Sequence, residues 1–221
     1  MKDKALTLIN EPERIKVCPM GVDLTNVFTP PAPNAEREGL IFVGRLVSKK
    51  GVKYLIEAIA KLIPNDPQIK LTVVGDGPDR KTLENLSHHH KLENTITFLG
   101  AKPQLVVRDL LRKHKIAIFP SIETESGDQE GLGLTIIEAL GCGCLTIASD
   151  QSAVHDIKHS CNDLILVEEK SVEAITESIK RLHTRPHSIT RCNRNMTEIY
   201  DWSSRTKLYS TTYALLKRQT T

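Results

Sequence analysis

The sequence predicts an α/β protein with a doubly wound, Rossmann-like parallel sheet of about six strands and a C-terminal helix. Short apolar, β-branched runs alternate along the chain with segments of helical periodicity. Most of these runs are almost continuously apolar, which is typical of parallel strands that helices cover on both faces. Strand–helix alternation is typical of a doubly wound sheet. At 221 residues, the chain can hold one large domain with an appendage.

The predicted elements follow one another in a regular order. The predicted strands are 40–43, 70–74, 95–98, 115–119, 144–148 and 164–167. The predicted helices between and after them are 51–63, 78–90, 104–114, 134–140 and 171–182. The first helix shows the pattern most clearly, because Val52, Leu55, Ile56, Ile59 and Leu62 recur with a period near 3.6 residues.

The two ends differ from this alternating middle. Prolines cluster between residues 10 and 35, and residues 1–35 are predicted to be a linker-like segment. Residues 36–185 are predicted to form the Rossmann-like domain, and 186–221 a helical C-terminal segment. The tail from Asp201 is predicted to be one helix with apolar residues available for one face: Trp202, Leu208, Tyr213 and Leu216.

Composition and charge exclude several classes of protein. Lys and Arg total 30 against 27 Asp and Glu, and a net charge of +3 predicts no general affinity for nucleic acid or membranes. We expect no signal peptide and no transmembrane helix, because the sequence shows no long apolar run. The five cysteines are irregularly spaced, which favours reduced thiols and a cytoplasmic location.

The first candidate site is the turn after the first predicted strand. The segment FVGRLVSKKG, residues 42–51, places Arg45, Lys49 and Lys50 at the edge of the sheet where open α/β proteins bind ligands. These side chains suit phosphate oxygens. Neither the dinucleotide-binding glycine pattern nor the P-loop pattern occurs, so side chains would supply the charge. A solvated basic loop is the alternative.

The second candidate is VVGDGPDR, residues 73–80, after the second predicted strand. Gly75 and Gly77 permit a tight turn, and Pro78 suits the first position of a helix. A plain β–α turn explains the segment equally well, although it would lie on the same edge of the sheet as the first candidate.

The third candidate, SIETESGDQEGLGLTIIEALGCG at residues 121–143, is the most informative. Gly131 and Gly133 precede a predicted helix, whose N-terminus would let backbone N–H groups approach an anion or a sugar hydroxyl. Glu138 follows Glu130 by eight residues, about two helical turns. Two carboxylates in this arrangement could hold a ribose and a hexose. The alternative is a capped helix with two surface glutamates.

In order and spacing, these motifs resemble the C-terminal donor-binding domain of family 4 glycosyltransferases (glycosyl transferases group 1), which have the GT-B fold. The resemblance covers about residues 17–216. The segments that carry it are VCPMGVDLTNVFTP, VGRLVSKKG, VGDGPDRKTLE, TITFLG and EGLGLTIIEALGCGCLTIASD. The sequence departs from the family where Cys144 replaces a usual proline and where residues 152–156 replace a G-G-x-P-E turn.

The resemblance implies a role for each candidate residue. Arg45 and Lys50 would hold the donor diphosphate and stabilise the leaving nucleotide, Glu130 would address the donor sugar, and Glu138 would hold the ribose hydroxyls. We expect the catalytic residues to be Arg45, Lys50 and Glu130. The further donor-binding residues are Gly44, Gly77, Gly100, Ala101, Lys102, Ser121, Asp128, Gly131, Leu132, Gly133, Leu134, Thr135 and Glu138.

The resemblance also implies the reaction, which is retaining transfer of a hexose from a UDP- or GDP-sugar to a glycan or lipid-linked acceptor. No metal or other cofactor is expected, because fixed cations can neutralise developing phosphate charge. His88, His89 and His90 are expected to be a solvated surface rather than a metal site.

The acceptor site of such an enzyme lies in a first Rossmann-like domain, whereas this chain begins in the linker. We therefore expect an enzyme of polysaccharide biosynthesis that is inactive as this chain alone. It would need an N-terminal acceptor domain, through which it could contact a membrane peripherally. One alternative is a non-catalytic nucleotide-sugar-binding subunit or a truncated relic that needs a partner. The other is a nucleotide-sugar epimerase of the same fold.

Overall fold

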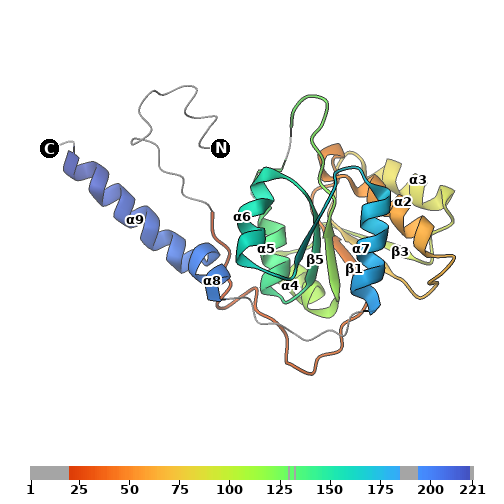
Figure 1. Ribbon diagram of the computed structural model, residues 1–221, viewed down its shortest axis with the longest axis horizontal. Coiled ribbons are helices and arrows are strands. Elements are labelled where there is room, and N and C mark those ends of the chain that lie inside the picture. The colour runs from red at the N-terminus through yellow and green to blue at the C-terminus, as the bar shows by residue number, and fades with distance from the viewer. Residues whose placement is uncertain (1–19, 129, 132, 185–193, 220–221) are drawn as a thin grey trace.

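The computed structural model describes residues 20–128, 130–131, 133–184 and 194–219, and the structural statements below concern these residues. The predicted α/β fold is confirmed: six parallel strands form one sheet in the order β3-β2-β1-β4-β5-β6 (Figure 1). The strands are β1 (Leu40–Val43), β2 (Leu71–Val74), β3 (Ile96–Gly100), β4 (Ile116–Phe119), β5 (Leu145–Ser149) and β6 (Leu164–Val167).

Helices connect the strands and extend the chain beyond the sheet. They are the short 3-10 helix η2 (Ser48–Lys50), α2 (Val52–Leu62), α3 (Arg80–His89), α4 (Gln104–Lys113), α5 (Leu134–Gly141), α6 (Ser152–Ser160), α7 (Val172–Thr184), α8 (Arg194–Tyr200) and α9 (Trp202–Gln219). Helix α6 was not predicted, whereas α8 lies in the C-terminal segment that was predicted to be helical. Helix α6 buries only Val154 and Ile157 among its apolar side chains, too few to show a helical period in the sequence.

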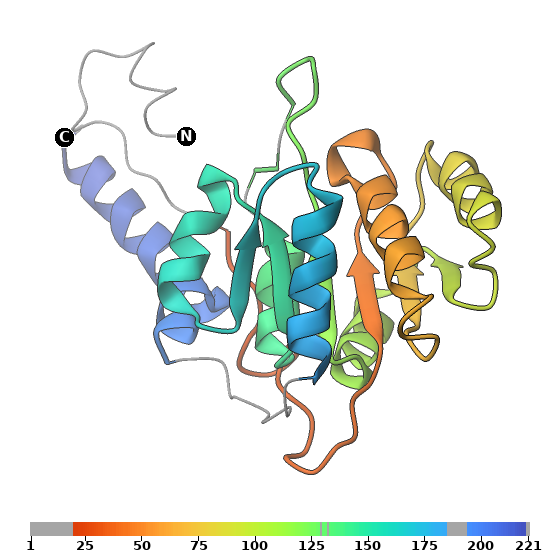
Figure 2. The same cartoon turned by 45° about the vertical axis from the view of Figure 1, so that its right-hand side comes forward.

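Helices cover the sheet on both faces, as Figure 1 and Figure 2 show from two directions. All four residues of β1 are buried, and they alternate between two cores. Leu40 and Phe42 pack in the core that contains the buried faces of α2 and α7. Ile41 and Val43 pack in the core that contains α5, α6 and α8. This two-sided burial explains why the strands appear as continuous apolar runs.

The order of the strands places a topological switch point between β1 and β4. The chain runs from β1 to β2 on one side and from β4 to β5 on the other, while β1 and β4 pair in parallel with Leu40 opposite Ile116. Open α/β sheets bind ligands outside the carboxyl ends of the strands at such a point. The loops that follow β1 and β4 therefore frame the candidate site.

These two loops touch through a glycine. Gly51 has φ +63°, and a Cβ there would lie 1.9 Å from the carbonyl oxygen of Pro120. The Ile122 N–H also donates to the Lys49 carbonyl oxygen at 2.8 Å. Only glycine combines this backbone conformation with so close an approach, and the contact fixes the distance between the two loops.

The first described residues of the chain pack against α8 and the residue that follows it. Val22, Leu24 and Phe28 are buried in the same core as Tyr200, so the segment predicted as linker-like contributes buried side chains to the domain. The buried Asp201 carboxylate accepts hydrogen bonds from the Leu24 N–H at 3.0 Å, the Thr25 hydroxyl and the Ser203 N–H and hydroxyl.

Helix α9 projects away from the sheet (Figure 1). Its predicted apolar face is largely open to solvent in the described residues: Trp202 is 58% exposed and Tyr213 64% exposed. Leu208 is partly buried, and the side chain of Leu216 lies outside the described part. In the part of the chain that the structure describes, no helix combines the length and apolarity needed to cross a bilayer.

Candidate functional site

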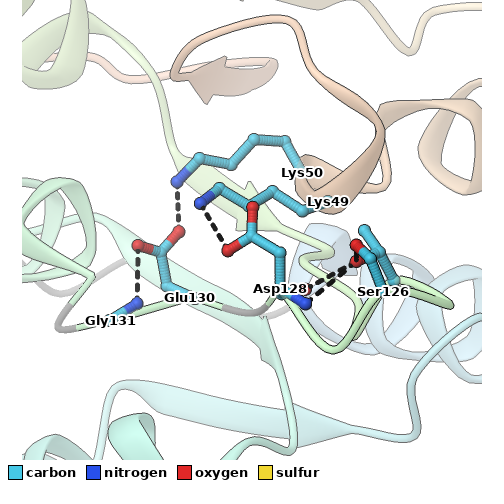
Figure 3. A network of polar contacts seen from close by, with 7 residues as sticks. Lys49, Lys50, Ser126, Asp128, Glu130 and Gly131 are labelled. Carbon is cyan, nitrogen blue, oxygen red and sulfur yellow. Dashed lines mark hydrogen bonds and ion pairs between the residues drawn. The ribbon is translucent and has the colours of Figure 1, made fainter.

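The loop after β1 and the loop after β4 bring two lysines against two carboxylates (Figure 3). Lys50 forms an ion pair with Glu130, and the two side chains are only 16% and 17% exposed. Lys49 Nζ lies 3.1 Å from Asp128 Oδ1 in a second pair, whose side chains are 31% and 61% exposed. The better buried pair holds the stronger electrostatic interaction, because water screens it less.

The Glu130 carboxylate contacts two hydrogen-bond donors at once. Its Oε2 faces the Lys50 ammonium, and its Oε1 accepts the Gly131 N–H at 3.2 Å. An ammonium and a backbone N–H are donors that also bind phosphate oxygens. The structure thus brings together three residues that the sequence placed in the site.

Arg45 provides a third positive charge at the same edge of the sheet. Its side chain is exposed, and within the described residues it has no hydrogen-bond or ion-pair partner. Lys50 is neutralised by a carboxylate and Arg45 is not, so Arg45 is the guanidinium at this edge that an anion could reach without breaking a contact.

The glycines of the second motif allow the loops to pack closely. A Cβ on Gly75, which has φ +139°, would lie 1.8 Å from the carbonyl oxygen of Gly44. A Cβ on Gly77 would lie 2.2 Å from the carbonyl oxygen of Leu46, and the Gly77 N–H donates to Asp76 Oδ1 at 2.8 Å. These glycines hold the loop after β2 against the loop after β1.

Sequence analysis missed Arg80, which lies beside the turn that ends β3. Arg80 Nε donates to Glu84 at 2.8 Å and Arg80 Nη1 to Asp76 at 3.0 Å. A Cβ on Gly100 would lie 3.1 Å from Arg80 Nη1. The i, i+4 spacing of these three charges is the sequence signal that could have revealed the network. It borders the exposed Ala101 and Lys102.

Helix α5 carries the second glutamate of the third motif. Gly133, with φ +63°, precedes the first residues of the helix, Leu134 and Thr135, whose side chains are half-buried. Burial raises the pKa of Glu138 to about 7, although a hydrogen bond with the Gln104 side chain opposes the rise. A carboxyl with such a raised pKa is a candidate for a functional group.

The remaining residues singled out by the sequence are Ser121, Leu132 and the three adjacent histidines. Ser121 is buried directly after β4. Leu132 lies outside the described residues. His88, His89 and His90 are exposed near the end of α3, and His88 pairs with Glu93. In the described ranges, no three His, Cys, Asp or Glu side chains gather in a way that could hold a metal ion.

Three cysteines lie within the described chain, namely Cys142, Cys144 and Cys161, and all are buried free thiols. Burial raises the pKa of Cys144 to about 11, while the nearby Arg37 guanidinium opposes the rise. Such thiols are protonated and unreactive at neutral pH, so they are part of the packing rather than of the site.

Comparison with known proteins identifies the family of the chain. Residues 26–198 match the family described as Glycosyl transferases group 1. The chain belongs to the glycosyl transferases group 1 family. This confirms the predicted family, and the confirmed sheet is one half of a GT-B fold. The match includes all six strands and every candidate site residue of this chain.

Individual relatives agree with this assignment. The chain is 29% identical over 198 residues to WcaL of Salmonella typhimurium, which is named as a candidate colanic acid biosynthesis glycosyltransferase. The alignment covers 86% of this chain and 48% of WcaL, so the chain spans about half the length of that relative.

Solved structures share the fold. The structure of HepE from Anabaena in complex with UDP and glucose superposes with a TM-score of 0.80 at 19% identity, covering 96% of this chain and 60% of HepE. The C-terminal domain of a glycosyl transferase group 1 protein, LpcC from Francisella tularensis, superposes with a TM-score of 0.65 at 24% identity. That comparison covers 86% of this chain and 98% of the LpcC domain.

Proposed function

We propose that this chain is the donor-binding domain of a retaining glycosyltransferase that takes a hexose from a UDP-sugar. The observation that carries the proposal is the Lys50–Glu130–Gly131 cluster at the switch point of the sheet. The half-buried Glu138 lies on the helix that follows this cluster. The comparison structure of HepE contains UDP and glucose, which supports UDP as the nucleotide.

Each residue has a chemical task in this proposal. Arg45 and Lys50 neutralise the negative charge that develops on the diphosphate leaving group, so no metal ion is needed for this task. Glu138 accepts hydrogen bonds from the two ribose hydroxyls, and Glu130 accepts from hydroxyls of the hexose. The base lies beside the exposed residues Ala101 and Lys102 at the end of β3. Retention of configuration is carried over from the family resemblance.

Transfer also requires a site for the acceptor. The chain spans about half the length of WcaL, and we propose that a second Rossmann-like domain holds a glycan or lipid-linked acceptor on the cytoplasmic side. The exposed aromatic residues of α9 favour a partner for this chain. A donor-binding subunit without activity of its own is therefore the second candidate function.

Calorimetry on the full chain tests the proposal. UDP and UDP-glucose are titrated, with ADP and free glucose as controls, and we expect UDP and UDP-glucose to bind in preference to ADP. Sugar transfer is then measured with and without a candidate N-terminal domain, and we expect transfer only with it. Failure to bind any nucleoside diphosphate would refute the proposal. A changed sugar without any acceptor would instead identify an epimerase.

A further inference from the structure

The Glu130 carboxylate occupies the position at Lys50 and Gly131 in which an anionic ligand would bind. It contacts the Lys50 ammonium on one side and the Gly131 N–H on the other (Figure 3). Both charged side chains are more than four-fifths buried. Glu130 and Lys50 are 80 residues apart in sequence, so the folded loops, and not local chain geometry, bring them together.

We propose that Glu130 competes with the nucleoside diphosphate for Lys50, and that this competition selects the intact nucleotide sugar over the nucleoside diphosphate product. The inference rests on the proposed function, because it requires that Lys50 binds the donor diphosphate. Because the Lys50 side chain is only 16% exposed, we expect a phosphate group that binds it to displace the Glu130 carboxylate. The cost of that displacement depends on what the released carboxylate can bind next.

The two ligands differ in what they offer to the released carboxylate. A nucleoside diphosphate alone brings only negative charge to this part of the site, so Glu130 loses a partner and gains a like charge. A nucleotide sugar brings hydroxyl donors together with its phosphates. Hydrogen bonds from these hydroxyls replace the contact with Lys50, so the exchange costs less for the complete donor.

The neighbouring charges do not provide the same discrimination. The Lys49–Asp128 pair is more exposed, so water can take the place of either partner when the pair opens. Arg45 is without a partner among the described residues, so it can bind the phosphates of either ligand without releasing a carboxylate. After transfer, the return of Glu130 to Lys50 would promote release of the nucleoside diphosphate.

The test is a double comparison of the full chain by calorimetry, with UDP and UDP-glucose as the probes. Glu130→Gln keeps the shape of the side chain and removes its charge, and we expect UDP to bind about tenfold more tightly. UDP-glucose should bind no more tightly than before, so the preference for the sugar nucleotide falls by at least the same factor. Glu125→Gln, an exposed acid of the same loop, is the matched control and should leave the preference unchanged.

A second variant separates competition from a general change in charge. In a Lys50→Ala background, the Glu130→Gln substitution should no longer tighten UDP binding. The reason is that Lys50, the cation for which Glu130 and UDP compete, is then absent. If Glu130→Gln leaves UDP affinity unchanged or weakens it while the wild-type chain binds UDP, the inference is wrong and the proposed function stands. If the wild-type chain binds neither probe, the proposed function fails and the inference fails with it.

Discussion

Glu138 allows a prediction in which stability and binding change in opposite directions. Burial raises the pKa of this carboxyl from its ordinary 4.5 to about 7. The folded protein therefore holds this proton more tightly than the unfolded chain does, and stability falls as the pH rises from about 4.5 to about 7. We predict that Glu138→Gln, which cannot ionise, stabilises the unliganded protein above that range.

The size of the effect follows from the raised pKa. A rise from 4.5 to about 7 corresponds to at most about 3.4 kcal/mol, because one pKa unit is worth about 1.4 kcal/mol. The side chain keeps part of its access to water, which lowers the expected gain to about 1–2 kcal/mol. At about pH 5 the folded protein is already protonated at this site, and the gain should fall below about 1 kcal/mol.

Urea denaturation at about pH 5 and about pH 8 measures the free energy of unfolding of the wild-type protein and of the Glu138→Gln variant. Calorimetry with UDP at about pH 8 then measures the binding change. We expect the variant to be more stable at the higher pH and to bind UDP more weakly, because an amide is a poorer acceptor for two ribose hydroxyls than a carboxylate. A variant that is equally or less stable at about pH 8 would refute the argument from burial.

Three further perturbations test other parts of the domain. Lys50→Ala should weaken UDP binding by about 10- to 150-fold and leave uridine binding unchanged, as measured by calorimetry, because it removes a charge-assisted contact to phosphate. Gly51→Ala should lower the free energy of unfolding by about 2 kcal/mol or more, because its Cβ would meet Pro120 and its φ is +63°. Gly131→Ala, with no atom within 4 Å of its Cβ, is the control in the same denaturation assay. Burial opposes ionisation of Asp201, but hydrogen bonds from Ser203, Thr25 and Leu24 outweigh it and lower its pKa. Asp201→Asn should therefore be less stable than wild type at neutral pH, and denaturation should show the difference shrinking as acid protonates the wild-type carboxyl.

The sheet could be predicted from the sequence because its signal is local. Each strand is a short apolar run whose boundaries lie within two residues of the predicted ones, and the longer helices show their own periodicity. The placement of the candidate residues at one edge of the sheet also follows from local information. Arg45, Lys50 and Glu130 lie in the segments that follow β1 and β4, and the carboxyl ends of parallel strands share one edge of the sheet.

Contacts between distant segments could not be predicted. Nothing in the sequence indicates that Lys50 pairs with Glu130, because the pairing depends on how the glycine contact with Pro120 sets the two loops. The burial of Val22, Leu24 and Phe28 depends in the same way on Tyr200 at the other end of the chain. A proline-rich segment has no helical or strand period, so its packing leaves no pattern to detect.

The site therefore separates two kinds of residue that a binding experiment alone would confuse. Gly51, Gly75 and Gly77 set the loops by sterics, since any Cβ there would lie within about 2.2 Å of a backbone oxygen of the neighbouring loop. Substituting them disturbs the fold and the site together. The charged residues Arg45, Lys50 and Glu130 do not hold the loops apart or together by volume, and they act on the ligand and on one another. A glycine variant should lose stability and affinity together, whereas a charge variant can lose affinity at unchanged stability. This difference distinguishes residues that shape the site from residues that perform its chemistry.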